Sequence, residues 1–399
     1  MTTETGVIER GIRRLPNGAL EVRVHVKRDP LTGQVRQVSR TTRKGIAEAR
    51  RIRSRLQAEA AQGKHAGPAM SFGALLDEWL THCENRALAP STLAEYRRKV
   101  AKVIAPELGG TRLHKLSAHR LDTWYGQLLV AGVTPRTIGH YHRIISASLH
   151  QAERWGWVDT SVARLVQPPR VPVTTMTVPP PERVQALIEA AASSRAPEIA
   201  TVITIAALTG LRRGELCGLM WSDVDWRGRW VAVERSIWQT SSGWGVKEPK
   251  SHQVRRLVLG EATIGVLAGR RRRVEDLCRA AEVDLASDAY IFSPDVDGSR
   301  PTMPGRLTQA FRRLCDQMED RAAKADPPRQ ESWPYRLHDL RHYTATELFR
   351  AGHSPRTVAD RLGHADPALT LRVYTANTED QARAAAVELE AGLIAPRGS

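Results

Sequence analysis

Six prolines within fourteen residues divide this 399-residue chain into two parts. They lie between Pro168 and Pro181, and none of them has the backbone N–H that a helix or a central strand requires. An extended linker is therefore expected at residues 169–181. The chain is also longer than one hydrophobic core normally supports, so two or three domains are expected, and 41% apolar residues are enough to fill their cores.

The beginning of the chain predicts a small antiparallel sheet followed by a helix. Residues 18–28 alternate apolar and polar side chains, which is the period of a half-buried strand. Residues 29–40 supply a turn and a returning strand, and residues 7–15 are expected to form the first of three strands. A helix rich in arginine is expected at about residues 46–61.

Charge indicates what this first module binds. The chain has 59 Lys and Arg against 43 Asp and Glu, a net charge of +16, which favours a polyanion, and nucleic acid before a membrane surface. Residues 1–70 alone hold 15 basic and 6 acidic residues, a local net charge of +9. A separate DNA-binding module explains this excess. The alternative is a basic protein whose arginine-rich helix is merely solvated.

The next part of the chain, residues 71–168, predicts a four-helix unit with Ser71 as the cap of its first helix. Its amphipathic segments are expected at residues 72–83, 91–110, 117–130 and 134–155. Beyond the linker the pattern is again mostly helical, with strand signals at residues 230–238 and 255–259. The fold class expected is mainly α and multidomain, with small β-sheets.

The four cysteines are scattered and form no CxxC pair. This spacing argues against a structural zinc site and a disulfide framework, and it favours reduced thiols in a cytoplasmic protein. No run of about 18 apolar residues exists, and the first residues lack the apolar core of a signal peptide, so no membrane association is expected. The final Pro396–Ser399 resembles a protease-site remnant, although a native terminus has equal standing.

The part of the chain after residue 200 contains four short segments with chemically distinctive residues. They are AALTGLRRGELCGLMWSDVD (206–225) with Arg212, KEPKSHQVRRLVL (247–259) with Lys250, RLHDLRHYTAT (336–346) with His338 and Arg341, and LGHADPALTLRVYTAN (362–377) with His364 and Tyr374. Each segment alone has an ordinary structural explanation. Together and in this order, they resemble the signature of the tyrosine recombinases, the phage integrase family.

The resemblance implies a site-specific integrase that cleaves and rejoins DNA through a 3′-phosphotyrosine, without metal, ATP or another cofactor. Arg212 and Arg341 are then the groups that hold the non-bridging oxygens of the scissile phosphate, a task that suits an always-charged guanidinium with paired donors. Lys250 is expected on a basic hairpin as the general acid for the leaving 5′ oxygen. Lys247, three residues earlier, is the competing candidate.

Tyr374 is the nucleophile that the resemblance implies. A phenol has a pKa of about 10, so at neutral pH it needs help to lose its proton. His338 is expected to accept that proton or to orient the phosphate, and His364 to hydrogen-bond the scissile phosphate. Stored energy in the phosphotyrosine bond explains why religation needs no ATP.

Two alternatives to this assignment remain at the sequence level. After HDLRH the family usually has Thr or Ser, whereas this chain has Tyr343, a rival nucleophile that is expected to be structural. A metal site is the second alternative, because four histidines are clustered in sequence: His338, His342, His353 and His364. No HExxH pattern accompanies them, and Asp339 is expected to support a neighbour rather than bind a metal.

The resemblance also implies domain roles and partners. Residues 1–65 resemble an arm-type DNA-binding domain, residues 71–168 a core-binding domain, and residues 182–399 the catalytic domain. The expected partners are double-stranded DNA attachment sites and three further copies of the chain in a tetramer on DNA, with an excisionase and a DNA-bending host factor as accessory proteins. The alternatives are a recombinase that resolves chromosome or plasmid dimers, and a DNA-binding regulator without catalysis. Residues 379–394 are expected to form a helix that packs on a neighbouring protomer or within its own.

Overall fold

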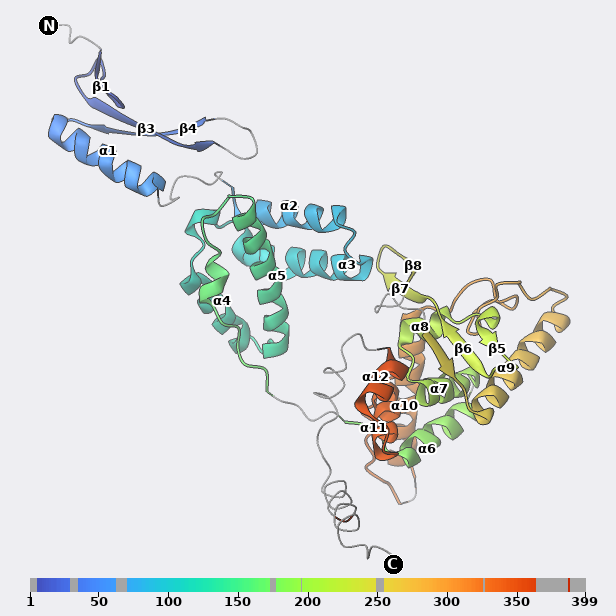
Figure 1. Cartoon of the computed structure of the whole chain (residues 1–399). Helices are drawn as coiled ribbons and strands as arrows, with labels where there is room; N and C mark the ends of the chain where they lie inside the picture. Colours follow the sequence, from blue (N-terminus) through green and yellow to red (C-terminus); the bar gives the residue numbers. More distant parts are fainter. Residues whose placement is uncertain are drawn as a thin grey trace, which may run out of the picture. The chain divides into compact units, whose positions relative to one another are not determined.

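The computed structural model describes residues 6–28, 35–61, 70–172, 177–194, 196–248, 255–325, 327–363 and 387. The chain forms two compact units, Met1–Thr174 and Thr175–Ser399, and the boundary lies within the proline-rich segment. Most elements are helices, accompanied by small antiparallel sheets, as the sequence predicts (Figure 1). Among the described residues, no helix has the length and apolar character needed to cross a membrane.

The first unit begins with a sheet of four strands in the order β1-β2-β3-β4, each antiparallel to the next. Its elements are β1 (Val7–Glu9), β2 (Ile12–Arg14), β3 (Leu20–Arg28), β4 (Val35–Thr42) and the helix α1 (Ile46–Ala61). The prediction of three strands is corrected here. The run of residues 7–15 reverses direction at Arg10 and Gly11, so its two halves pair with each other as β1 and β2 instead of forming one strand.

One face of this sheet packs against α1. The apolar side chains Ile12, Leu20, Val22 and Val24 form a cluster with Ala49 and Leu56 of the helix. The period-two pattern of β3 therefore leaves Glu21, Arg23 and His25 on the opposite face, where Arg23 and His25 are exposed.

A separate helical cluster forms the rest of the first unit. Its elements are α2 (Phe72–Asn85), α3 (Pro90–Lys99), the π-helix η1 (Val100–Gly109), the short 3-10 helix η2 (Leu113–Lys115), α4 (Ala118–Val130), α5 (Pro135–Arg154) and η3 (Val162–Leu165). The predicted helix starts are confirmed by their caps. The hydroxyl oxygens of Ser71, Ser117 and Thr134 accept hydrogen bonds from backbone N–H groups three residues later.

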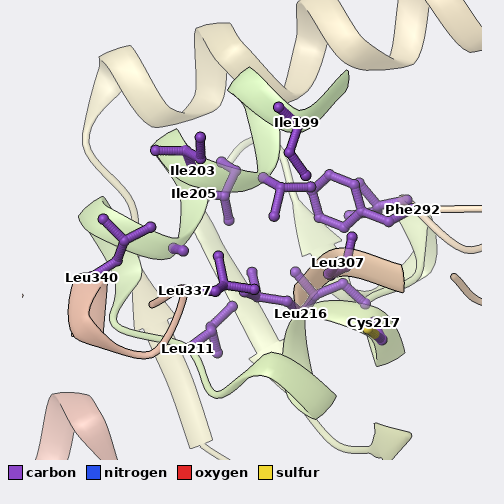
Figure 2. Packing of buried hydrophobic residues seen from close by; sticks show 14 of the residues in the cluster. Ile199, Ile203, Ile205, Leu211, Leu216, Cys217, Phe292, Leu307, Leu337 and Leu340 are labelled. Carbon is purple, nitrogen blue, oxygen red and sulfur yellow. The ribbon is translucent and has the colours of Figure 1, made fainter. Parts of the chain in front are cut away.

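The second unit is built around α7, in which seven of twelve residues are buried. Its elements are α6 (Pro181–Ala192), α7 (Glu198–Thr209), α8 (Arg213–Gly218), η4 (Trp221–Asp223), β5 (Val224–Asp225), β6 (Trp230–Val233), β7 (Ser236–Thr240), β8 (Gly243–Lys247), β9 (Arg255–Val258), α9 (Glu261–Ala280), α10 (Pro304–Ala323), α11 (Asp339–Arg350) and α12 (Pro355–Leu362). Helix α7 packs against α6, α9 and α11. Figure 2 shows Ile203 of α7 and Leu340 of α11 within the same apolar core, together with Leu211 and Leu216 from the segment that follows α7.

The small sheets of this unit correct one prediction. Residues 247–259 were expected to form a basic hairpin, but the strands at its two ends belong to different sheets. A tight turn at Ser241–Ser242 lets β8 pair with β7, whereas β9 pairs with β6 in the sheet β5-β6-β9. The segment thus connects two sheets, and Lys250 lies between them in sequence, outside the described residues.

Candidate active site

Three of the six predicted catalytic residues lie in the described part of the second unit. They are Arg212, His338 and Arg341. The other three, Lys250, His364 and Tyr374, lie outside the described residues, as do most of residues 379–394. The geometry of the site is therefore that of the first three residues and their neighbours.

Arg212 is positioned by the turn that follows α7. The helix ends at Thr209, and Gly210 takes the left-handed conformation, with φ +66°, that terminates it. A Cβ atom at Gly210 would clash with a methyl carbon of Leu362, so the close packing of α12 also favours glycine there. Leu211 is buried and anchors the turn, which leaves Arg212 in an extended conformation at the N-terminus of α8.

A buried carboxylate holds Arg212 and a second arginine together. Glu215 Oε1 accepts from Arg212 Nη1 at 2.9 Å and Oε2 accepts from the Arg212 backbone N–H at 2.9 Å. Arg255 donates from both terminal nitrogens, Nη2 to Oε2 at 2.7 Å and Nη1 to Oε1 at 3.2 Å. Burial alone would raise the pKa of Glu215, but the hydrogen bonds and charge of Arg255, with the charge of Arg212, lower that pKa below its ordinary value.

Gly363 closes these contacts into a ring. Arg212 Nη2 donates to the Gly363 carbonyl at 2.8 Å, and Gly363 itself ends α12 with φ +67°. A Cβ atom at Gly363 would lie 2.8 Å from Arg255 Cζ, so the guanidinium of Arg255 lies directly against this residue. We refer to Arg212, Glu215, Arg255 and Gly363 as the arginine ring.

Arg341 is attached to the same turn as Arg212. It lies on α11, is 3% exposed, and donates from Nη1 to the carbonyl of Gly210 at 2.6 Å. One turn of helix further on, Thr344 Oγ1 donates to the Ala207 carbonyl at 2.8 Å, which fixes α11 against the end of α7. The Arg341 guanidinium is therefore bonded to the turn that directly precedes Arg212, although the two arginines are far apart in the sequence.

His338 precedes α11, three residues before Arg341, and its ring meets that of His342 edge to face at 5.1 Å. Part of its side chain is exposed, yet desolvation of the ring by the surrounding protein, helped by His342 and Arg341, lowers the pKa of His338 to about 4. The imidazole is therefore neutral at physiological pH and has a nitrogen lone pair that can accept a proton or a hydrogen bond.

The competing candidates take other positions. Tyr343 packs, partly buried, against the main apolar core, and burial, with the charge of Glu347, raises the pKa of its phenol. Lys247 is the last residue of β8 and pairs with Ser236 of β7. Asp339 accepts two side-chain hydrogen bonds from Arg336. Among the described residues, no three His, Cys, Asp or Glu side chains are grouped so that they could hold a metal ion.

The sequence reasoning missed two arginines of this region. Arg255 has the same strand parity as the buried Leu257 and Leu259, and this alternation is a signal that it faces inward. Arg361 has no such signal. Its Nη1 donates to the Val258 carbonyl at 3.1 Å and its Nη2 to the Leu208 carbonyl at 3.0 Å, so it fastens α12 to the ends of β9 and α7.

Proteins of known sequence and structure resemble this chain over most of its length. The ICEBs1 integrase of Bacillus subtilis (strain 168) is 24% identical over 369 residues, which cover 91% of this chain and 94% of that protein. The transposase from transposon Tn916 of Enterococcus faecalis is 26% identical over 293 residues, which cover 70% of this chain and 67% of that protein.

Two solved structures share the fold. The Tn1549 transposon integrase in complex with a circular intermediate DNA has a TM-score of 0.65 at 21% identity, covering 80% of this chain and 99% of that chain. A lambda integrase dimer bound to a COC' core site has a TM-score of 0.55 at 19% identity, covering 93% of this chain and 96% of that chain.

A family model matches the part of the chain that contains the candidate site. Residues 180–381 match the phage integrase family. This range spans half of the chain and contains the whole arginine ring together with His338 and Arg341. The chain therefore belongs to the phage integrase family.

Proposed function

We propose that this chain is a tyrosine-type, site-specific DNA recombinase that integrates a phage or mobile element by cutting and rejoining DNA strands. The observation that carries the proposal is that Arg212 follows the Gly210 turn to which Arg341 is bonded, and that the neutral His338 lies three residues before Arg341. Two fixed guanidiniums and an uncharged imidazole match the needs of a phosphodiester whose charge grows in the transition state.

Arg212 is suited to bind a phosphate while it stays in the arginine ring. Each of its terminal nitrogens carries two hydrogens, and the bonds to Glu215 and Gly363 use one from each nitrogen. The second hydrogen of each can be donated to the non-bridging oxygens. Because the protein bonds already fix the guanidinium plane, little reorganisation is needed when charge develops.

In the proposed reaction, the phenol oxygen of Tyr374 forms a bond to the scissile phosphorus and the bond to the 5′ oxygen breaks. The phenol proton passes to His338, and Lys250 donates a proton to the departing 5′ oxygen. His364 hydrogen-bonds the phosphate beside Arg212 and Arg341. Attack of a 5′ hydroxyl on the phosphotyrosine reverses these steps and rejoins the strands without ATP.

The remaining parts of the chain have proposed roles in binding DNA. We assign arm-type site binding to residues 1–65, core-site binding to residues 71–168 and catalysis to residues 182–399. The sheet of the first module exposes Arg23 and His25 on the face away from α1, which supports a DNA contact there. We further propose a tetramer on two attachment sites, in line with the solved lambda integrase tetramer bound to a Holliday junction, and excision with accessory proteins.

The test is covalent capture on a nicked suicide substrate that contains the attachment core. Tyr374→Phe should bind this DNA with unchanged affinity and form no covalent adduct, because the attacking oxygen is gone. Tyr343→Phe is the matched control and should form the adduct at the normal rate. An adduct with Tyr374→Phe, or its loss with Tyr343→Phe alone, would contradict the assignment of the nucleophile.

A further inference from the structure

We propose that Arg255 is a positioning residue that holds Arg212 in its phosphate-binding orientation and couples it to the two chain segments carrying Lys250 and His364. The inference rests on the proposed function, and it assigns a role to a side chain outside the six catalytic candidates. Arg255 itself is only 10% exposed and does not have to touch the DNA to act.

The first support is the geometry around Glu215. This carboxylate is 1% exposed and receives two N–H bonds from Arg255 and two from Arg212, so each arginine meets both of its oxygens. If Arg255 withdrew, Glu215 could rotate toward solvent or pull Arg212 with it, because a buried carboxylate needs its partners. The plane of the Arg212 guanidinium therefore depends on Arg255 through one shared carboxylate.

The second support is the contact between Arg255 and Gly363. The guanidinium of Arg255 occupies the space where a side chain at position 363 would start, with three of its atoms within 2.9 Å of that point. Gly363 in turn presents its carbonyl to Arg212 Nη2 at 2.8 Å. Arg255 thus contacts the residue immediately before His364, and Arg212 is bonded to the carbonyl of the same residue.

The third support is the place of Arg255 in the chain. It is the first residue of β9, so it directly follows the segment 249–254 that contains Lys250. Pairing of Arg255 with Val233 fixes the start of β9 in its sheet. One side chain consequently contacts Glu215 and Gly363, while its backbone anchors the end of the segment that carries the proposed general acid.

The test compares two conservative substitutions at neighbouring residues. Arg255→Lys keeps the charge but cannot give paired bonds to both oxygens of Glu215. Arg256→Lys is the matched control, because Arg256 is exposed and places its guanidinium over the Trp230 ring at 4.4 Å. On the suicide substrate at saturating DNA, Arg255→Lys should slow adduct formation on the order of 100-fold, whereas Arg256→Lys should stay within about twofold.

A modified substrate separates positioning from general weakening of the fold. A methylphosphonate at the scissile position replaces one non-bridging oxygen by methyl and removes the charge that Arg212 is proposed to bind. The two diastereomers of the methylphosphonate are tested separately. Each replaces a different non-bridging oxygen, and the two oxygens face different protein groups. If Arg255 acts through Arg212, the loss of adduct rate caused by Arg255→Lys should fall to about tenfold or less on one diastereomer. The loss caused by Arg212→Lys should fall on the same diastereomer.

A second pair of variants covers the case in which Arg255→Lys fails to fold. Gly363→Ala places a methyl group against Arg255, and Gly352→Ala is its control, since Gly352 has a similar φ of +82° but nothing within 4 Å of an added Cβ. Gly363→Ala should slow adduct formation far more than Gly352→Ala at equal thermal stability.

Three results would overturn the inference: equal rates for the two arginine variants, equal rates for the two glycine variants, or an Arg255→Lys defect of the same size on every substrate. An unmodified protein that forms no adduct would instead remove the proposed function on which the inference rests.

Discussion

Two carboxylates of the described residues, each held by two arginines, lie in very different surroundings. Glu215 in the second unit pairs with Arg212 and Arg255, and Glu21 in the N-terminal sheet pairs with Arg13 and Arg23. The side chain of Glu215 is 1% exposed and its arginine partners 24% and 10%, whereas the side chain of Glu21 is 12% exposed and its partners 45% and 41%. One glutamate and two arginines thus build a fixed support in one place and an adjustable charged surface in the other.

The difference follows from solvent. Buried charges are screened little and lose their hydration, so their positions are sharply defined and loss of one partner is strongly destabilising. Exposed pairs gain little from each other and exchange partners readily. The buried arrangement around Glu215 suits the precise orientation of a phosphate. The exposed arrangement around Glu21 suits contact with the DNA backbone, whatever the base sequence.

The largest expected effect concerns catalysis. Arg212→Lys should reduce the rate of adduct formation on the suicide substrate about 100- to 1,000-fold, because a lysine cannot serve Glu215, Gly363 and the phosphate together. Arg23→Lys should leave this rate unchanged. Similar losses in both variants would show that the two arrangements do not differ in function.

The next effect concerns stability. Glu215→Gln should lower the free energy of unfolding of the second unit by about 3 kcal/mol, because it leaves Arg212 and Arg255 close together without a compensating charge. Glu21→Gln, with exposed partners, should change the free energy of unfolding by less than about 1 kcal/mol. Urea unfolding followed by far-UV circular dichroism measures both, because residues 1–70 contain no tryptophan, and equal losses would contradict the contrast.

A smaller effect should appear in acid. The pKa of Glu215 is lowered in the folded state, since the two arginines outweigh the effect of burial. Its contribution is therefore complete above the unfolded pKa of about 4.3 and is lost as pH falls through the folded value. Between pH 6 and pH 3, the unmodified protein should lose stability more steeply than Glu215→Gln. Parallel curves would exclude a role for this carboxylate in the acid response.

The smallest effect concerns the salt dependence of DNA binding. Arg23→Ala should reduce the slope of log K against log salt for duplex DNA by up to about 0.9, the value expected for one phosphate contact. The overall affinity at low salt should change only modestly. Titration of labelled DNA at several salt concentrations measures the slope, and an unchanged slope would place the DNA contact elsewhere.

Local signals predicted much of the fold. The helix α1 begins and ends at the predicted residues, α2 begins after the predicted cap Ser71, and α4 and α5 begin one residue after the predicted starts of their segments. Helix periodicity and capping are properties of neighbouring residues, so they are legible in the sequence. Strand pairing is not local. This explains why the runs at residues 7–15 and 247–259 were misassigned, since the partner of each strand depends on turns and on distant strands.

The candidate site was likewise predicted only in part. The motifs identified Arg212, His338 and Arg341, but not the hydrogen bond that joins Arg341 to the Gly210 turn before Arg212. Arg255 and Arg361 were missed because their partners are carbonyls and a carboxylate far away in the sequence. The roles of Lys250, His364 and Tyr374 stay predictions, because these residues lie outside the described part of the chain.

The close approach of Arg255 to Gly363 has a consequence for how such a protein can evolve. A side chain at position 363 forces the Arg255 guanidinium to shift, and φ +67° disfavours such a side chain even after the shift. Replacing the arginine first leaves Glu215 with one partner in a buried place. Neither position can change alone without loss, so the two are expected to be inherited as a pair, and random mutagenesis should recover substitutions at 255 and 363 together or not at all.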